Sequence, residues 1–249
     1  ENRYGKKLGT TGGWSKIKKR WQTLQRQLSG MQARESFDAH TSLISDILEH
    51  MAYGMDISKL TIDMGIDCFY LMDTMVNGLP LSIEYNGQIR GLGAGAVASR
   101  KLTDEDKVRL VVLSGLSRSA IAGVASSMNR VFKENPPLRD QLEPYVKDAV
   151  ASVHASLKML DRKVLYARAI SIDPSAYFTA FTKDIETSFK LYQGVTSALY
   201  SRLHEHANKL KKVKDYIRSF VLISLVVLFY LFVGNYFSVM SSLSNLMSA

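Results

Sequence analysis

Proline and cysteine are both scarce in this 249-residue chain. Three of its five prolines fall within residues 136–144, so long stretches contain no residue that breaks a helix. Its one cysteine, Cys68, excludes an intrachain disulfide and the CxxC patterns of metal and redox sites. The sequence also lacks the signatures of serine hydrolases, zinc proteases and kinases. We therefore expect no catalytic residues and no cofactor.

Charge is unevenly distributed, although the net formal charge is +9. Basic residues gather in residues 1–26 and 209–218, the part between them is nearly neutral, and residues 219–249 carry no charge. A nucleic-acid-binding protein would need a broader basic face, so we do not expect nucleic acid as a partner. A basic cluster beside an apolar run is typical of contact with lipid headgroups.

The apolar run predicts a membrane span. Residues 219–240 read SFVLISLVVLFYLFVGNYFSVM, and a bilayer core needs about 20 mostly apolar residues in a helix. The positive-inside rule would place residues 209–218 in the cytoplasm, but this rule is weak beside a large translocated domain. The orientation therefore stays open on these grounds.

Apolar residues recur at the helical period along the rest of the chain, and no segment has the pattern of a strand. Thr103 and Asp173 are good N-caps, and Pro174 suits the first helical position. Pro80 is expected to kink its helix. On the last helix the apolar stripe begins with Phe178 and Phe181 and runs to Leu203. We predict helices at residues 14–28, from 36, from 67, 104–134, 138–169 and 173 to about 240. The fold class is all-α: an elongated antiparallel helical bundle that continues into a transmembrane helix.

The stretch GQIRGLGAGAVAS, residues 87–99, raises the question of a phosphate-binding loop. The dinucleotide loop needs G-x-G-x-x-G after a strand, whereas Gly91, Gly93 and Gly95 are spaced G-x-G-x-G and follow a helix. Small residues instead let helices approach closely, and Gly91 and Gly95 lie on one helical face. We predict close helix packing here, with room for a pocket.

Arg90 stands among these small residues. A buried arginine needs a partner, so we expect Arg90 to reach solvent, to pair with Asp73 or Glu84, or to face a cavity. In the last case Arg90, Gln88, Tyr70 and Asp73 would line a site for a small anion, because guanidinium groups bind carboxylates and phosphates. Metal binding is not expected: Asp46 and His50 are suitably spaced, but no third ligand is evident.

Several motifs together resemble the sensory half of bacterial methyl-accepting chemotaxis proteins, whose helical periplasmic domain is shared with some sensor histidine kinases and diguanylate cyclases. They are RYGKKLGTTGGWSKIKKRWQTL, ESFDAHTSLISDIL, FYLMDTMVNGLP, GQIRGLGAG, KLTDEDKVRL, IDPSAYFTAFTKDI and YLFVGNYFSVMSSLSNL. The sequence departs from relatives at ISKLTID, where they usually have a serine-glycine step before LTLD.

This resemblance implies a domain organisation and a location. Residues 1–218 would form the periplasmic sensory domain, 219–237 the transmembrane helix in the inner membrane, and 238–249 the start of a HAMP linker. A first transmembrane helix and a first periplasmic helix would precede Glu1. The implied partners are membrane lipid, a second copy of the chain in a homodimer, and a small anionic ligand.

Two functions from different classes follow. The first is a signal-receiving module that passes helix displacements through the membrane to a cytoplasmic output. The alternative is a structural or tethering membrane protein without a ligand. The sequence beyond Ala249 would distinguish them, because a receptor continues into a HAMP linker and an output module.

Overall fold

The computed structural model describes residues 4–58 and 65–247, and every regular element in these ranges is helical. This confirms the all-α fold class. Most of the ISKLTID segment and the last two residues of the expected linker lie outside the described residues. The chain divides into two compact units, Glu1–Tyr200 and Ser201–Ala249, and one helix, α8 (Pro174–Met247), contributes to both.

The first unit begins with a helical hairpin. After the short helix α1 (Gly5–Leu8), α2 (Thr11–Gln27) packs against α3 (Ala33–Ser58) across a single turn of 3₁₀ helix. Ile17 and Leu24 of α2 share a small core with Leu43 of α3. Both α2 residues belong to the apolar stripe of this basic helix, and its charged side chains remain exposed.

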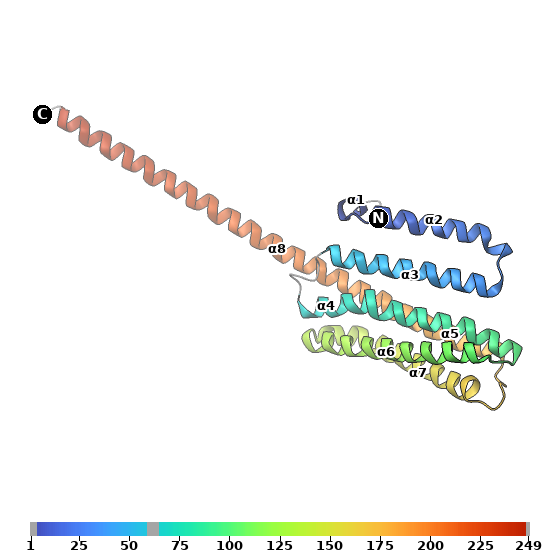
Figure 1. The fold of residues 1–249 in the computed structure, drawn as a ribbon. Coiled ribbons are helices and arrows are strands. Elements are labelled where there is room, and N and C mark those ends of the chain that lie inside the picture. Colours follow the sequence, from blue (N-terminus) through green and yellow to red (C-terminus); the bar gives the residue numbers. More distant parts are fainter. Residues whose placement is uncertain (1–3, 59–64, 248–249) are drawn as a thin grey trace. The chain divides into compact units, whose positions relative to one another are not determined.

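A larger bundle follows, built from α4 (Ile66–Asp73), α5 (Leu79–Ser99), α6 (Asp104–Glu134), α7 (Pro137–Leu160) and the first part of α8. Successive long helices run in opposite directions (Figure 1). The core is the stripe that the sequence pattern predicts, and on α6 it comprises Leu110, Leu113, Ser117, Ile121, Val124, Met128 and Val131, all of them buried. Helix α3 packs on α5 and joins the hairpin to this bundle.

The turn between α5 and α6 is closed by local hydrogen bonds. Arg100 adopts the left-handed conformation with φ 51° at the end of α5, and the amides of Arg100 and Lys101 donate to carbonyls of the last turn. Thr103 caps α6 by accepting from the amide of Asp106 at 3.1 Å, as predicted. These bonds satisfy backbone groups that a helix end leaves unpaired.

Helix α7 is shorter than predicted. It ends at Leu160 and widens into a π-helical turn over Asp161–Leu165, after which Tyr166 leaves the helical conformation. The prediction that this helix extends to Ala169 is therefore wrong, because the π-helical turn is its last turn. A second π-helical turn, Thr74–Gly78, lies just before Pro80, where proline cannot donate the hydrogen bond that an α-helix requires.

The buried face of α8 also differs from the predicted apolar stripe, by one position in the sequence. Phe178 was expected on the apolar stripe, but its side chain is 47% exposed, whereas Tyr177 is fully buried. Tyr177 stands four residues before the buried Phe181 and seven before Asp184, which is also buried. The helical period thus selects Tyr177, although Phe178 is the more apolar residue.

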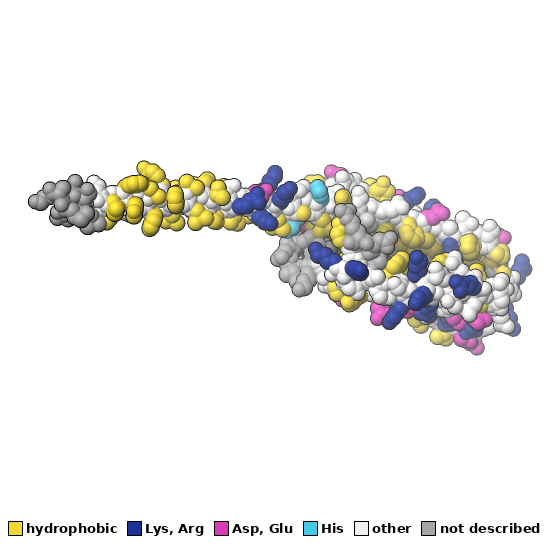
Figure 2. Space-filling view, turned by 90° about the horizontal axis from the view of Figure 1, so that it is seen from above, with side chains coloured by type: hydrophobic (Ala, Val, Ile, Leu, Met, Phe, Trp, Pro, Cys, Tyr) yellow, Lys and Arg dark blue, Asp and Glu magenta, His cyan; other side chains and the backbone are white. Residues whose placement is uncertain are grey.

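The second unit contains the remainder of α8, which includes the charge-free run. Figure 2 shows Lys and Arg side chains next to a segment covered with apolar ones. The span Pro174–Ser241 is long and apolar enough to cross a membrane, and its most apolar window is not buried against the protein. Helix α6 also passes this test of length and composition, but one face of it lies in the bundle core.

Candidate ligand-binding cavity

The glycine stretch lies within helix α5 and does not form a loop. Its glycines lie on two opposite faces of this helix. Gly93 is buried against α8, whereas Gly91 and Gly95 are exposed toward α3. The same short sequence therefore permits one close helix contact and leaves one cavity.

Gly93 allows Tyr177 of α8 to reach the backbone of α5. A Cβ atom at position 93 would lie 1.8 Å from the Tyr177 hydroxyl oxygen. That hydroxyl donates a 2.8 Å hydrogen bond to the carbonyl of Ile89, and burial raises the pKa of the phenol well above its ordinary value. The missing side chain of Gly93 thus lets α8 pack closely on α5.

The opposite face of α5 borders a cavity of about 600 Å³. A Cβ atom at Gly91 would lie 3.0 Å from the ring of Phe37, but one at Gly95 would meet no atom within 4 Å. Gly91 therefore lies close to the Phe37 ring, whereas the missing side chain of Gly95 leaves open space. The lining comes from α3, α5 and the start of α6: Ala33, Arg34, Ser36, Phe37, Gly91, Leu92, Gly95, Ala96, Ser99, Lys101, Thr103 and Asp106.

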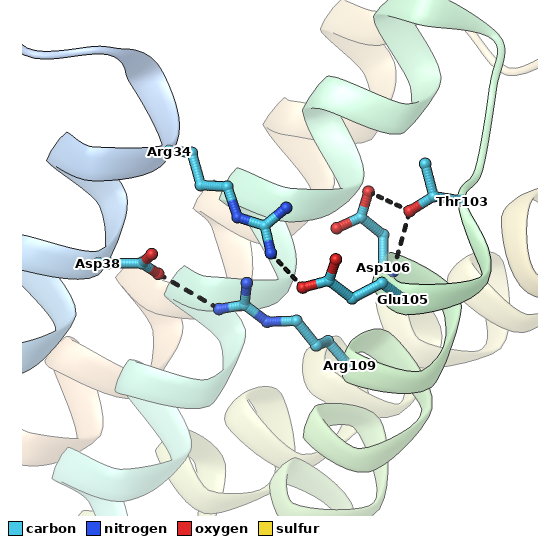
Figure 3. A network of polar contacts seen from close by, with 6 residues as sticks. All are labelled: Arg34, Asp38, Thr103, Glu105, Asp106 and Arg109. Carbon is cyan, nitrogen blue, oxygen red and sulfur yellow. Dashed lines mark hydrogen bonds and ion pairs between the residues drawn. The ribbon is translucent and has the colours of Figure 1, made fainter.

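Polar contacts join α3 to the start of α6 beside this cavity (Figure 3). Arg34 pairs with Glu105, and this hydrogen-bonded carboxylate raises the pKa of the guanidinium. Arg109 pairs with Asp38 at 3.4 Å, and its guanidinium carbon lies 5.6 Å from the ring centre of Phe37. Two ion pairs thus hold one wall of the cavity in place.

The cavity combines an apolar interior with a charged rim. Phe37, Leu92 and the small residues of α5 supply apolar surface, while Arg34, Lys101 and Asp106 supply charge. Glu105 neutralises Arg34 and Thr103 donates to Asp106 at 2.8 Å, but Lys101 makes no ion pair within the described part of the chain. This composition suits a small ligand with an apolar body and a carboxylate or phosphate group.

Arg90 lies on the α8 side of α5, away from the cavity. It donates a 3.0 Å hydrogen bond to the Thr182 hydroxyl, and its guanidinium carbon is 4.6 Å from the ring centre of Phe178. The expected ion pairs with Asp73 and Glu84 do not form among the described residues. A cation–π contact and one hydroxyl satisfy this half-buried arginine instead.

The other residues expected around Arg90 are engaged elsewhere. Gln88 donates to Glu84 at 2.8 Å, and burial raises the pKa of the Glu84 carboxyl. Tyr70 accepts a hydrogen bond from Arg130, and its ring lies beneath that guanidinium. Asp73 accepts from Asn77 and Ser127. The four expected residues thus take part in separate contacts, and none of them lines the cavity.

The cavity residues contributed by α3 and by the α5–α6 turn could not be recognised from sequence. Arg34 and Lys101 are 67 positions apart in the sequence, and only the packing of α3 on α5 brings their segments to one cavity. The available signal was the four-residue spacing of Gly91 and Gly95.

The described residues contain no group of three or more His, Cys, Asp or Glu side chains that could hold a metal ion. Asp46 pairs with Arg20 of α2, and His50 stacks on Trp14 with ring centres 6.3 Å apart. Both residues therefore contribute to packing between α2 and α3.

The described residues form an all-helical bundle, and two of its helices, α6 and α8, are long and apolar enough to span a membrane. No protein-family model, curated protein or solved structure matches the chain.

Proposed function

We propose that the chain is the signal-receiving module of a bacterial transmembrane receptor of the chemotaxis-transducer type. The observation that carries this proposal is the position of α5. One face of α5 lines the cavity, and the other contacts α8 through the Tyr177–Ile89 and Arg90–Thr182 hydrogen bonds. Helix α8 itself continues without interruption into the apolar run.

The proposed mechanism is a small displacement of helices. A ligand in the cavity would contact Gly91 and Gly95 and move α5, and the two hydrogen bonds would transfer that movement to α8. Displacements of about 1–2 Å are sufficient in such transitions. Because Gly95 has no neighbour within 4 Å in the direction of its missing side chain, a ligand can approach the α5 backbone there.

The proposed ligand is a small organic anion, with Lys101 as the counter-charge and Phe37 and Leu92 as the apolar contact. The proposed setting is the bacterial inner membrane, with residues 1–218 in the periplasm, residues 219–237 across the bilayer, residues 238–249 at the start of a HAMP linker, and the chain acting as a homodimer. The resemblance supports this orientation. Basic residues at 209–218 would then contact lipid headgroups outside the cytoplasm.

Insertions into α8 test the mechanism in the full-length protein. One alanine inserted after Leu210 rotates the helix beyond it by about 100°, whereas seven inserted residues restore its phase to within about 20°. A receptor should lose or invert its output with one inserted residue and keep it with seven. A tethering protein should tolerate both insertions, and that outcome would refute signalling through α8.

Reporter fusions test the orientation. A reporter that is active only outside the cytoplasm should work after Arg218 and fail after Ala249. The opposite pattern would place the bundle in the cytoplasm.

Blocking the cavity tests the ligand site. Gly95→Leu should fill the cavity and abolish the response to the ligand. The matched control is Gly123→Leu on α6, because Gly123 also has open space around its missing side chain but does not line the cavity. A normal response in Gly95→Leu would exclude this cavity as the ligand site.

A further inference from the structure

A carboxyl group lies in the core of the bundle, on the helix proposed to carry the signal. Asp184 of α8 is fully buried, three residues after Phe181 on the inward face. Its Oδ1 accepts a 2.6 Å hydrogen bond from Ser152 of α7, while Oδ2 has no hydrogen-bond partner among the described residues. A buried carboxylate with one unsatisfied oxygen is costly when ionised.

Further polar side chains lie at the level of Asp184 on the neighbouring helices. Asn86 of α5 accepts a 2.8 Å hydrogen bond from Ser117 of α6, and both are fully buried. Helices α5 and α8 run in opposite directions, and Arg90 of α5 contacts Thr182 of α8. The residue one helical turn before Arg90 therefore lies level with the residues about one helical turn after Thr182. This register places Asn86 level with residues 184–188.

The polar groups at this level are incompletely paired among the residues that the structure describes. The Asn86 amide nitrogen and the Ser188 hydroxyl are buried and have no partner among the described residues. Ser188 follows Asp184 by one helical turn and is also fully buried. A neutral Asp184 can donate a hydrogen bond as well as accept one, so the packing of this layer depends on its charge state.

Solvent comes close to Asp184 through a groove between α7 and α8. The groove has a volume of about 660 Å³, and Ser152 and Ser156 are part of its lining. Ser152 therefore touches the groove on one side and Asp184 on the other. The groove thus brings solvent within one side chain of the carboxyl group.

The charged groups around Asp184 do not neutralise it. Lys183 is its sequence neighbour and favours the ionised form, but its side chain is exposed and lines the groove. Burial outweighs Lys183 and the Ser152 and Ser156 hydroxyls, and raises the pKa of Asp184 to about 6. Charged groups on the packed helices include Asp148 of α7 and Lys190 of α8 at the groove, Glu84 and Arg90 of α5 in their own contacts, and Arg118 of α6 paired with Asp161.

We propose that Asp184 is a protonation switch through which the protein responds to acidity on the side of the membrane that holds the bundle. In the neutral form the side chain belongs to the polar layer and holds α8 against α7. In the ionised form the unsatisfied oxygen draws in solvent from the groove and loosens the α7–α8 contact. This inference rests on the proposed receptor function only where it concerns signalling output, because the titration of Asp184 and its effect on the α7–α8 contact do not depend on that function.

The switch predicts a large change in population over a narrow pH range. With a pKa of about 6, the ratio of neutral to ionised Asp184 falls from about 10:1 at pH 5 to about 1:30 at pH 7.5. Nitroxide labels on Ala155→Cys and Ala180→Cys, in a Cys68→Ala background, report the distance across the groove in the full chain in nanodiscs. We expect this distance to increase between pH 5 and pH 7.5, with its midpoint near 6.

Two variants test whether Asp184 causes the change in distance. Asp184→Asn has nearly the same shape, can still accept from Ser152, and should keep the short distance at every pH. Asp148→Asn removes an exposed carboxylate from the same groove and should leave the midpoint unchanged. A wild-type distance that does not change with pH, or changes equally in Asp184→Asn, would overturn the proposal.

Output of the full-length protein separates this inference from the proposed function. A response to pH that is lost in Asp184→Asn supports both. If the distance changes with pH and the output responds only to other stimuli, the sensing role of Asp184 is refuted and the receptor function stands. If the distance changes with pH but the protein tolerates both insertions in α8, the receptor function is refuted and the titration of Asp184 remains a property of the bundle.

Discussion

Gly93→Ala is the most demanding test of how the bundle is packed. The added Cβ atom would lie 1.8 Å from the Tyr177 hydroxyl and 2.4 Å from the ring carbon that bears it. Real side chains do not approach so closely, so Tyr177 must move. Because Tyr177 is fully buried and bonded to the Ile89 carbonyl, any movement breaks that bond or displaces its neighbours in the core.

The expected cost follows from three terms. Overpacking of a core costs about 1–3 kcal/mol, and a buried hydroxyl that loses its hydrogen-bond partner, here that of Tyr177, costs about 1–3 kcal/mol. Alanine in place of glycine inside a helix returns about 1 kcal/mol. The free energy of unfolding should therefore fall by about 1–5 kcal/mol, with about 3 kcal/mol as the central value.

The matched control is two residues away. Gly95 lies in the same helix, but a Cβ atom there meets nothing within 4 Å. Gly95→Ala should therefore raise the free energy of unfolding by about 0.5–1 kcal/mol, since only the helix preference changes. The two substitutions thus have opposite signs, and thermal unfolding followed by circular dichroism in detergent measures both.

A partial rescue would identify the cause. Tyr177→Leu removes the ring atoms that the new Cβ meets, so it should cost less in the Gly93→Ala background than in the wild type. If Gly93→Ala and Gly95→Ala change the melting temperature equally, Gly93 does not provide the space for Tyr177 and the packing argument fails.

Three further predictions concern caps, titration and the membrane. Thr103→Ala removes the cap of α6 and should cost about 1 kcal/mol in thermal unfolding, while Thr103→Asn should restore most of it. The pKa of Asp184 rises from 3.8 unfolded to about 6 folded, so the folded state binds the proton more tightly. The free energy of unfolding should therefore fall by about 3 kcal/mol as the pH rises from about 3.8 to about 6. Asp184→Asn should remove this pH dependence, and an unchanged dependence in that variant would contradict the prediction. Val227→Lys places a charge within the apolar run at a cost of about 2.5–3.5 kcal/mol and should lower the fraction of the fragment 1–249 that stays in membranes on alkaline extraction, unlike Tyr216→Lys outside the run.

Much of the fold follows from local sequence signals. The inward stripe of α6 and its cap at Thr103 depend only on spacing and on one side chain, and both are confirmed. The extent of α7 was wrong because a π-helical turn replaces its last α-helical turn. Hydrophobicity also misassigned Phe178, since the phase of α8 is set by several core residues together and buries Tyr177 instead.

The candidate site was harder to predict, because its parts come from distant segments. Spacing alone put Gly91 and Gly95 on one face, and the structure shows a cavity there. Sequence could not show that Arg34 and Lys101 belong to the same cavity, because this depends on how α3 packs on α5. It also could not place Arg90, whose partners Thr182 and Phe178 lie on α8, some ninety residues away.

Arg90 and Asp184 show why charge in a sequence is a poor guide to where charge matters in a fold. Arg90 is conspicuous in the sequence because it stands among small residues, yet a ring and a hydroxyl of α8 satisfy it. Asp184 is inconspicuous, because its neighbours Lys183 and Glu186 give the segment the pattern of a solvated helix face. The helical period nevertheless turns Asp184 inward with Phe181 and Ser188, and both of its neighbours outward. The cost of burying a charge depends on the phase of the helix and on the partners across it, and local sequence context concealed Asp184, whose pKa burial raises.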